Sequence, residues 1–226
     1  RRTGSVTLAT DPERLEELKR QATMARAFGV ECELIARDFL LDHWPEIRTD
    51  DVLGGVYLAG DGQTNPVDTT QALARGAVAL GAQINEGTRV ESLKVEEGKA
   101  VGVELSDGSQ VKANRVVLAG GMWSREFAAR SGVSIPLHAA EHFYVVTESI
   151  EGFDAMRPTL RIPGEQAYYK YDAGKLLLGF FELNAKPWGA EGIRDDFAFE
   201  SLPPDLPHLE PLLSSAMSRY PGLDSV

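Results

Sequence analysis

The chain has 226 residues, of which 43% are hydrophobic and 25% charged, the composition of an ordinary globular protein that can bury a core. Its formal net charge of -11 argues against nucleic acid and an anionic membrane as partners, because their phosphates attract basic surfaces. No apolar run approaches the roughly 18 residues of a spanning helix. Cys32 is the only cysteine, which excludes an internal disulfide and a cysteine zinc cluster.

The first part of the chain predicts alternating strands and helices. Ser5–Ala9 has the pattern of a strand, and Thr10-Asp11-Pro12-Glu13 is a helix start, in which a capping residue precedes proline and an acid. Gly29 ends this helix. A short strand over 33–35, a short helix over 36–44 and a strand over 54–59 are predicted next.

A third helix is predicted over 67–80. Asn65-Pro66 again places a capping residue before proline, and Gly81 is a C-terminal cap. One face of this helix is small or apolar, which predicts close packing on a sheet; it consists of Ala72, Leu73, Gly76, Ala77 and Leu80. The next strand is expected over 83–85.

The segment from Arg89 to Ser124 is the most informative part of the sequence. Apolar residues alternate with polar ones and indicate strands with one buried face, while Glu97-Gly98 and Asp107-Gly108 are hairpin turn signals. Val116-Val117-Leu118-Ala119 is typical of a strand covered on both faces. Gly120 and Gly121 then remove side chains where the backbone can approach another group, and a helix is expected over 124–131.

The remaining sequence predicts mainly strands, over 141–148, 160–162, 167–171 and 176–182, and one last helix over 206–220. Asp172-Ala173-Gly174-Lys175 is a hairpin turn signal. We expect one domain interrupted by its neighbour, with residues 1–50 and 134–226 in the first and 51–133 in the second. We also expect an internal piece of a longer protein, because the chain starts without methionine and ends just after a helix.

Several motifs resemble the D-amino-acid-oxidase-like flavoproteins, in the order Gly60-Asp61-Gly62-Gln63-Thr64-Asn65-Pro66, Arg75-Gly76-Ala77, Leu80-Gly81-Ala82, Thr88-Arg89-Val90 and Val117-Leu118-Ala119-Gly120-Gly121-Met122-Trp123-Ser124. Glu141-His142-Phe143-Tyr144-Val145-Val146-Thr147 and Tyr168-Tyr169 resemble the branch of the dimethylglycine and sarcosine dehydrogenases. The resemblance covers nearly the whole chain. Two residues depart from it: Asn65 stands where aspartate is usual, and Gln63 where histidine is common, which leaves the amine substrate open.

The resemblance implies an α/β (α+β) fold with an incomplete, Rossmann-like FAD-binding domain and a substrate domain built on an antiparallel sheet. FAD is the implied cofactor, and in this branch a tetrahydrofolate-binding region often follows downstream. The family's Gly-x-Gly-x-x-Gly loop, which places the pyrophosphate on a helix N-terminus, does not occur in this chain. We therefore expect the isolated chain to bind FAD weakly or not at all. The implied location is the bacterial cytoplasm or the mitochondrial matrix.

Five residues match the family's cofactor site. The backbone of Val90 would contact the adenine of FAD, and Ala119, Gly120 and Gly121 would let the dinucleotide lie against main chain. Trp123 would pack near the flavin. A strand valine, a tight turn between strand and helix, and a core tryptophan are the structural alternatives. No spacing of His, Asp and Glu indicates a metal site.

His142 and Tyr168 are the candidate catalytic residues. On a strand over 141–148, His142 would share one face with Tyr144, and its imidazole would accept a proton from a substrate ammonium; a structural histidine is the alternative. The Tyr168 hydroxyl would hydrogen-bond the substrate, while Tyr169 points to the opposite face of a regular strand. Three histidines match no motif and are expected at the surface: His43, His138 and His208. Arg161 is expected in solvent, with pairing to a carboxylate as the alternative.

The predicted function is oxidative demethylation of an N-methylglycine, dimethylglycine or sarcosine, by hydride transfer from the N-methyl carbon to FAD. The resulting iminium ion would hydrolyse to formaldehyde or pass its one-carbon unit to tetrahydrofolate. Two alternatives stay open. One is a non-catalytic regulator of the pyruvate dehydrogenase phosphatase type, which acts by protein contact. The other is an oxidase of another amino acid. The sequence does not reveal the oligomeric state.

Overall fold

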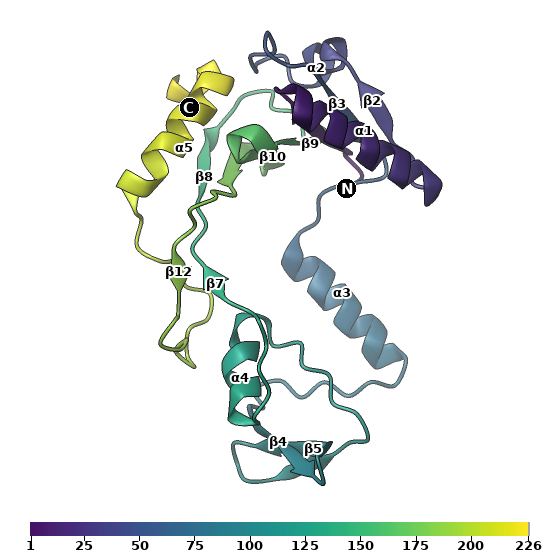
Figure 1. Cartoon of the computed structure of the whole chain (residues 1–226), viewed down its shortest axis with the longest axis vertical. Coiled ribbons are helices and arrows are strands. Elements are labelled where there is room, and N and C mark those ends of the chain that lie inside the picture. The colour runs from purple at the N-terminus through teal and green to yellow at the C-terminus, as the bar shows by residue number, and fades with distance from the viewer. Residues whose placement is uncertain (226) are drawn as a thin grey trace. The chain divides into compact units, whose positions relative to one another are not determined.

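The computed structural model describes residues 1–225, which form two compact units (Figure 1). The first unit contains Arg1–Asn65, His142–Ala185 and the residues from Pro203 onward, and the second contains Pro66–Glu141 and Lys186–Leu202. No helix of the described chain is both long and apolar enough to cross a membrane.

The first unit is built on a seven-stranded sheet in the order β2-β3-β1-β9-β10-β11-β8. The strands are β1 (Ser5–Ala9), β2 (Glu33–Ile35), β3 (Gly54–Leu58), β8 (Tyr144–Ser149), β9 (Thr159–Ile162), β10 (Ala167–Asp172) and β11 (Lys175–Phe180). β1 and β9 are parallel, and the other neighbours are antiparallel. The predicted hairpin between β10 and β11 is confirmed, because Ala173 and Gly174 both have positive φ, as a two-residue turn requires.

Helices cover the two faces of this sheet unequally. One face packs against α2 (Arg37–His43) and α5 (Leu206–Arg219) and forms the main core, whose members include Val6, Leu8, Leu40, Trp44, Leu160, Tyr169, Leu178, Phe180, Leu209 and Ala216. On the other face, α1 (Pro12–Ala27) packs Leu18 and Ala22 against Ala9 and Val56, at the end formed by β1, β2 and β3. Over β8 to β11 this face remains open in the unit, and Tyr144 is 62% exposed there.

The second unit contains α3 (Pro66–Ala79), a three-stranded meander and α4 (Ser124–Arg130). The strands of the meander are β4 (Val90–Glu96), β5 (Lys99–Leu105) and β6 (Gln110–Lys112). Its predicted turns are confirmed, since Glu97, Gly98 and Gly108 have positive φ. A small two-stranded sheet joins β7 (Ala139–Ala140) to β12 (Pro187–Trp188), and the short 3₁₀ turns are η1 (Gly121–Trp123), η2 (Pro163–Glu165) and η3 (Pro221–Ser225).

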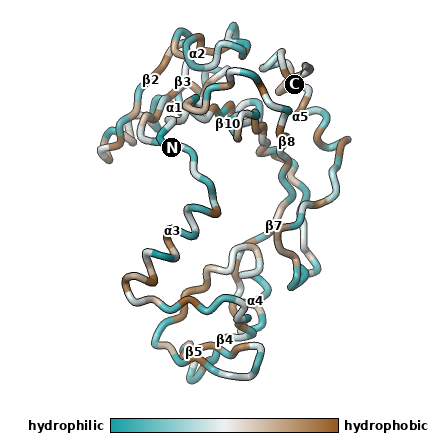
Figure 2. Tube along the Cα trace, turned by 180° about the vertical axis from the view of Figure 1, so that it is seen from behind, coloured by the Kyte–Doolittle hydropathy of each residue, from teal (hydrophilic) through white to brown (hydrophobic). Residues whose placement is uncertain are grey.

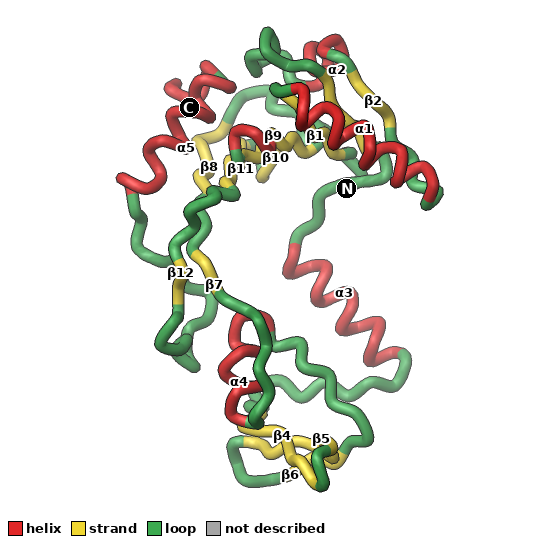
Figure 3. The backbone as a smooth tube through the Cα atoms, in the orientation of Figure 1, coloured by secondary structure: helices red, strands yellow, loops and turns green. Residues whose placement is uncertain are grey.

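Two strands predicted for this unit are absent from the described chain. Residues 83–85 and 116–119 are irregular, and the stretch between β6 and η1 is loop (Figure 3). Val117 is 87% exposed rather than buried. A short apolar run becomes a strand only where neighbouring strands accept its backbone hydrogen bonds, and the described residues form no such ladder here.

Helix α3 forms as predicted, but its predicted packing face is wrong for this structure. The helix has no buried residue, and Leu73 and Leu80 are 71% and 92% exposed. Figure 2 shows apolar and hydrophilic residues alternating along it. The physical reason is the same: the strands predicted at 83–85 and 116–119 do not form, so the small-residue face lacks the sheet on which it was expected to pack.

The unit boundaries differ from the predicted domain boundaries at 50/51 and 133/134. The first change of unit comes after Asn65, because β3 pairs with both β1 and β2. The second comes after Glu141, and residues Lys186–Leu202 join the second unit because β12 pairs with β7. The predicted α/β fold class is confirmed, with a mixed sheet in the first unit and antiparallel sheets in the second.

Candidate functional site

A row of side chains crosses the open face of the first unit's sheet. The strand register pairs Tyr144 with Gly179, Gly179 with Tyr168, and Tyr168 with Arg161. Residues in register point to the same face of a sheet, so these four positions share one face. Tyr169 points to the opposite face and is 0% exposed in the core, as the alternation of the strand predicts.

The ring of Tyr168 lies over Gly179. A Cβ atom at position 179 would be only 2.1 Å from Cζ of Tyr168, so any larger residue would displace the ring. Burial, and then the neighbouring Tyr144, raise the pKa of the Tyr168 hydroxyl. The hydroxyl therefore stays protonated near neutral pH and can donate a hydrogen bond.

His142 does not lie on a strand, which corrects the prediction of a strand over 141–148. Strand β8 begins at Tyr144, and the backbone N–H of Glu141 donates instead to the carbonyl of Lys186 at 2.9 Å. Phe143 is the first residue whose backbone follows β11, because its carbonyl accepts from Phe180 N–H at 3.0 Å. His142 thus lies between two backbone pairings, that of Glu141 with Lys186 and that of Phe143 with Phe180, and is part of neither strand.

The side chain of His142 nevertheless comes close to Tyr168 through a shared aromatic neighbour. The ring of Phe181 meets the His142 imidazole edge-on at a centroid distance of 5.7 Å. The same ring lies 5.4 Å from that of Tyr168. His142 is 46% exposed at its side chain, and its Nδ1 lies 3.4 Å from Oε2 of Glu182. The two candidate catalytic residues therefore both contact the ring of Phe181 on the first unit.

His208 is not a surface residue, contrary to the sequence expectation. Its side chain is 18% exposed, its Nε2 lies 3.7 Å from Oε1 of Glu182, and its ring is 5.3 Å from that of Phe143. Helix α5 carries it to this position, and nothing local in the sequence signals the contact. His43 is also half-buried and stacks on Phe39 at 3.9 Å, whereas His138 is exposed beside Arg125.

A cavity of about 420 Å³ adjoins this cluster and is lined by Arg14, Arg161, Gln166, Phe181 and four further residues. Arg161 is exposed and forms no ion pair with any residue that the structure describes. Arg14 pairs with Glu17, but its buried Nε has no hydrogen-bond partner in the described chain. Two guanidinium groups suit a carboxylate ligand. The sequence reasoning missed Arg14, because its position on a helix resembles that of any exposed arginine.

The residues assigned to FAD lie in the second unit. Val90 and Trp123, each 37% exposed, both line a cavity of about 210 Å³ together with Arg89, Phe127 and Arg130. Gly121 has a φ of +56°, and no atom lies within 4 Å of the position a Cβ would take there. The main chain around Gly120 and Gly121 is therefore accessible, which fits a flat group lying against bare backbone.

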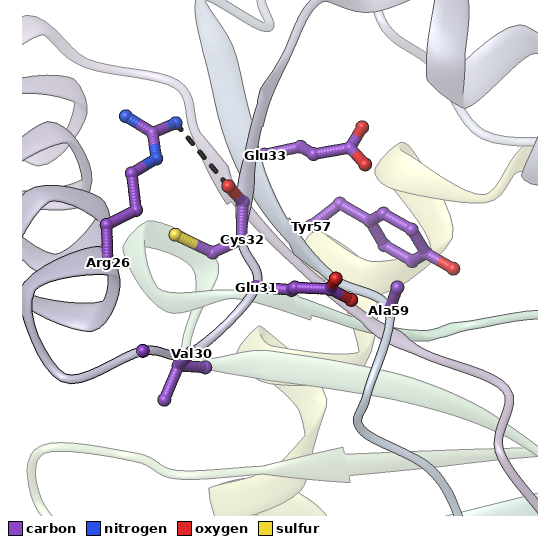
Figure 4. A pocket seen from close by; sticks show the side chains of 8 residues that line it. Arg26, Val30, Glu31, Cys32, Glu33, Tyr57 and Ala59 are labelled. Carbon is purple, nitrogen blue, oxygen red and sulfur yellow. Dashed lines mark hydrogen bonds between the residues drawn. The ribbon is translucent and has the colours of Figure 1, made fainter.

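Another cavity of about 420 Å³ lies at the edge of the sheet beside β2 (Figure 4). None of the predicted site residues lines it. Two of its polar groups have structural partners, since the Cys32 thiol donates to the Ala22 carbonyl at 3.2 Å and Arg26 donates to the Cys32 carbonyl at 3.4 Å. Within the described residues, no group of three or more His, Cys, Asp and Glu is arranged to hold a metal ion.

Comparison with known proteins identifies relatives along the whole chain. A 4-methylaminobutanoate oxidase (formaldehyde-forming) of Paenarthrobacter nicotinovorans is 35% identical over 224 residues, which are 99% of this chain and 27% of that protein. The mitochondrial pyruvate dehydrogenase phosphatase regulatory subunit of Mus musculus is 33% identical, over 100% of this chain and 26% of its own length. Mitochondrial dimethylglycine dehydrogenase of Rattus norvegicus is 34% identical, over 97% of this chain and 26% of its own length.

The chain thus spans about a quarter of the length of these curated relatives. Among solved structures, L-proline dehydrogenase from P. horikoshii has the same fold, with a TM-score of 0.83, 23% sequence identity and coverage of 99% of this chain and 57% of that one. The family described as DAO, FAD dependent oxidoreductase, matches residues 1–226. The chain therefore belongs to the DAO family of FAD dependent oxidoreductases, as its motifs predicted.

Proposed function

We propose that the protein carrying this chain oxidatively demethylates an N-methylated glycine, dimethylglycine or sarcosine, and uses FAD as its cofactor. The observation that supports this most directly is the row of Arg161, Tyr168 and Tyr144 on the open sheet face, with His142 beside it. These side chains match the two ends of an N-methyl amino acid, since one end needs a cation or a hydrogen-bond donor and the other a proton acceptor.

The carboxylate end would bind at the cavity that Arg161 and Arg14 line. Arg161 forms no ion pair with any described residue, and its register partner Tyr168 carries a protonated hydroxyl on the same face of the sheet. Charge-assisted hydrogen bonds from a guanidinium would fix the orientation of the substrate. This arrangement would hold the amine end on the side of the cluster where Phe181 and His142 lie.

His142 would accept the proton of the substrate ammonium. Oxidation of an amine needs the nitrogen lone pair, which is available only once that proton has left. The imidazole is half-exposed, so it can reach a ligand on the open face, and Phe181 shields one side of it from water. Histidine is suited to this task because its ordinary pKa lies near neutrality.

The adenine end of FAD would lie against Val90, Ala119, Gly120, Gly121 and Trp123, whose cavity and accessible main chain fit a flat ring. Bound FAD would supply the acceptor for the two electrons removed from the substrate. Tetrahydrofolate, if the one-carbon product passes to it, would bind outside this chain. The first unit would bind and orient the amine, and the second would hold part of the cofactor.

Stopped-flow reduction of the flavin tests this proposal in the polypeptide of natural length. Dimethylglycine and sarcosine should bleach the flavin, and 4-methylaminobutanoate and D-alanine should do so more slowly. Faster reduction by 4-methylaminobutanoate would move the assignment to a longer N-methyl amino acid, the substrate in the name of one relative. Faster reduction by D-alanine would indicate an oxidase of ordinary amino acids.

A substitution at His142 tests the role of this residue in the same assay. His142→Ala should slow flavin reduction about 10²- to 10⁴-fold, the usual contribution of a general base. His43→Ala is the matched control, because His43 stacks on Phe39 away from this cluster. A rate within twofold of wild type for His142→Ala would remove His142 from the mechanism.

A non-catalytic regulator is the second candidate function. It is favoured by the 33% identity to the pyruvate dehydrogenase phosphatase regulatory subunit, which extends over this whole chain. The same stopped-flow assay separates the two. Absence of flavin reduction by every amine, in a protein that retains FAD, would support the regulator.

A further inference from the structure

We propose that Glu182 is a positioning residue that fixes the imidazole of His142 in the Nδ1–H tautomer and leaves Nε2 free to accept a proton. This inference rests on the proposed function for its meaning in catalysis. The experimental test is independent of the proposed function, because it observes the tautomer of His142 directly.

The first observation is the burial of an acidic side chain with few donors. Glu182, two residues beyond the end of β11, is only 4% exposed at its side chain. Burying a carboxylate is unfavourable unless hydrogen-bond donors replace the lost water. Among the described residues, the polar side chains in contact with it are two imidazoles, those of His142 and His208. The stability of this site therefore depends on where the imidazole protons lie.

The second observation is which nitrogen of each ring faces the carboxylate. Nδ1 of His142 lies 3.4 Å from Oε2, and Nε2 of His208 lies 3.7 Å from Oε1. The distance from Nε2 of His208 to Oε1 is too long for a hydrogen bond, and Oε1 has no other hydrogen-bond partner within the described chain. Oε1 therefore lacks a donor unless His208 turns its N–H toward it. When the carboxyl group of Glu182 is ionised it only accepts hydrogen bonds, and the imidazole nitrogen that faces it then carries the proton.

The consequence for His142 follows from the chemistry of imidazole. A neutral ring carries one proton, and a proton on Nδ1 leaves the lone pair of Nε2 unoccupied. Phe181, edge-on to the ring at an interplanar angle of 68°, limits rotation of the ring away from this arrangement. Hydrogen bonding of the second ring nitrogen to a carboxylate is a common way to orient a functional histidine.

In the proposed reaction the N–H bond of the substrate ammonium breaks and its proton moves to Nε2 of His142. The electron pair of that bond stays on the substrate nitrogen. The imidazolium that forms then lies beside the carboxylate of Glu182, which stabilises its positive charge. Glu182 gains and loses no proton in this step, and it acts only through His142.

Nitrogen-15 NMR of the 226-residue chain tests the tautomer. Long-range ¹H–¹⁵N spectra are recorded over a rising pH series until the ring signals show the neutral form, and they then show which nitrogen is protonated. His142 should show a protonated Nδ1 and an unprotonated Nε2. A dominant Nε2–H signature for His142 in the wild-type chain would overturn the inference without any variant.

Two substitutions assign the cause. Glu182→Leu removes the acceptor at similar size, and His142 should lose its Nδ1–H signature. His208→Phe is the matched control, since it removes the other imidazole and keeps the carboxylate, so His142 should keep that signature. An unchanged tautomer in a folded Glu182→Leu variant would contradict the role of Glu182. If that variant does not fold, the wild-type spectrum still decides.

A kinetic measurement separates positioning from a purely structural role. In the polypeptide of natural length, Glu182→Leu should lower the limiting rate of flavin reduction about 10- to 100-fold and leave the half-saturating substrate concentration nearly unchanged. An unchanged limiting rate would contradict the inference. If the wild-type tautomer is as expected but no amine reduces the flavin, only the proposed function fails. If amines reduce the flavin and His142 is the Nε2–H form, only the positioning role fails.

Discussion

Tyr168 and Tyr169 are neighbours in sequence with opposite surroundings. Tyr169 is 0% exposed, burial raises the pKa of its hydroxyl, and that hydroxyl has no hydrogen-bond partner among the described residues. A buried hydroxyl without a hydrogen-bond partner destabilises the folded state. The stabilising contribution of Tyr169 therefore comes from packing of its aromatic ring in the core. The hydroxyl of Tyr168 instead faces the open side of the sheet.

This contrast gives a prediction for two matched substitutions. Tyr169→Phe should leave the free energy of unfolding unchanged or raise it by up to about 1 kcal/mol, because it removes an unsatisfied buried group. Tyr168→Phe should also leave stability unchanged but slow flavin reduction in the natural-length polypeptide. Urea unfolding of both variants is the measurement. A loss of more than about 1 kcal/mol in Tyr169→Phe would reveal a hydrogen bond that this structure lacks.

Gly179 determines the position of the Tyr168 ring. Gly179→Ala would place a methyl group 2.1 Å from Cζ of Tyr168, so the ring must rotate off the sheet face. We expect the chain to stay folded and amine-dependent flavin reduction to fall at least about tenfold, as for a displaced positioning group. Gly60→Ala is the control, because no atom lies within 4 Å of its new Cβ. Equal rates for the two variants would show that the ring position is unimportant.

At the scale of elements, Arg219 joins the end of α5 to the rest of the first unit. Its guanidinium, 0% exposed, binds both carboxylate oxygens of Asp51 at 2.7 and 2.8 Å, and its Nε donates to Glu165 at 2.9 Å. The hydrogen bond from Arg219 holds the pKa of Asp51 below its ordinary value. The ion pair thus connects a helix, a loop and a 3₁₀ turn that are far apart in sequence.

This contact predicts an acid-dependent loss of stability. Asp51 binds protons more weakly in the folded state, so its contribution is complete above the ordinary aspartate pKa of ~3.9 and is lost as pH falls through the lower folded value. In urea unfolding, Asp51→Asn should therefore reduce the decline in stability below about pH 4. A decline equal to that of wild type would assign the acid sensitivity to other carboxylates.

Removal of the cation should have a larger effect at neutral pH. Arg219→Met should lower the free energy of unfolding by about 2–3 kcal/mol, less than the ~3–5 kcal/mol of a fully buried pair because Asp51 is 40% exposed. Arg194→Met is the matched control, since Arg194 is 60% exposed in its pair with Glu200. It should change stability by less than about 0.5 kcal/mol.

Helix α3 should be the least protected helix in hydrogen exchange. None of its residues is buried, so its hydrogen bonds open without breaking tertiary contacts. Deuterium uptake measured by mass spectrometry should be complete in α3 peptides long before it is in β10 and β11, whose Tyr169 and Leu178 lie in the core. Equal protection of α3 and β10 would show that the helix packs on a surface that this structure lacks.

At the scale of the whole molecule, we propose that the chain contributes part of a cofactor site and part of a substrate site. The accessible main chain at Gly120 and Gly121 and the cavity beside Val90 fit the adenine end of a dinucleotide. The sequence contains no Gly-x-Gly-x-x-Gly loop to hold a pyrophosphate. Most of the binding free energy of FAD would therefore have to come from residues outside these 226.

We accordingly expect the isolated chain to be colourless. After incubation with excess FAD and gel filtration, its visible spectrum should show no stoichiometric flavin. The polypeptide of natural length is the control and should keep its flavin through the same column. A yellow, fully loaded preparation of the isolated chain would contradict this expectation and place the main cofactor contacts within the 226 residues.

Local chemistry in the sequence determined a large part of the fold. Asp11 caps α1 by accepting from Arg14 N–H at 2.8 Å, and the glycine-containing turns take the positive φ that their residues predict. Strand alternation placed Tyr168 and Tyr169 on opposite faces. The order and spacing of the motifs indicated the family. These features depend on residues close in sequence, and such local patterns can be read from the sequence itself.

The tertiary structure alone decided which apolar segments became strands and which polar groups met. Residues 83–85 and 116–119 have strand-like sequences but no neighbouring strand in the described chain. His142 lies outside β8 because the preceding residue, Glu141, forms its backbone hydrogen bond with Lys186, 45 positions away. Glu182 and His208 meet only because the fold places the segment after β11 beside α5 in the first unit. Hydrogen bonds and burial between residues far apart in sequence depend on which segments the fold brings together. A local sequence pattern does not specify those segments.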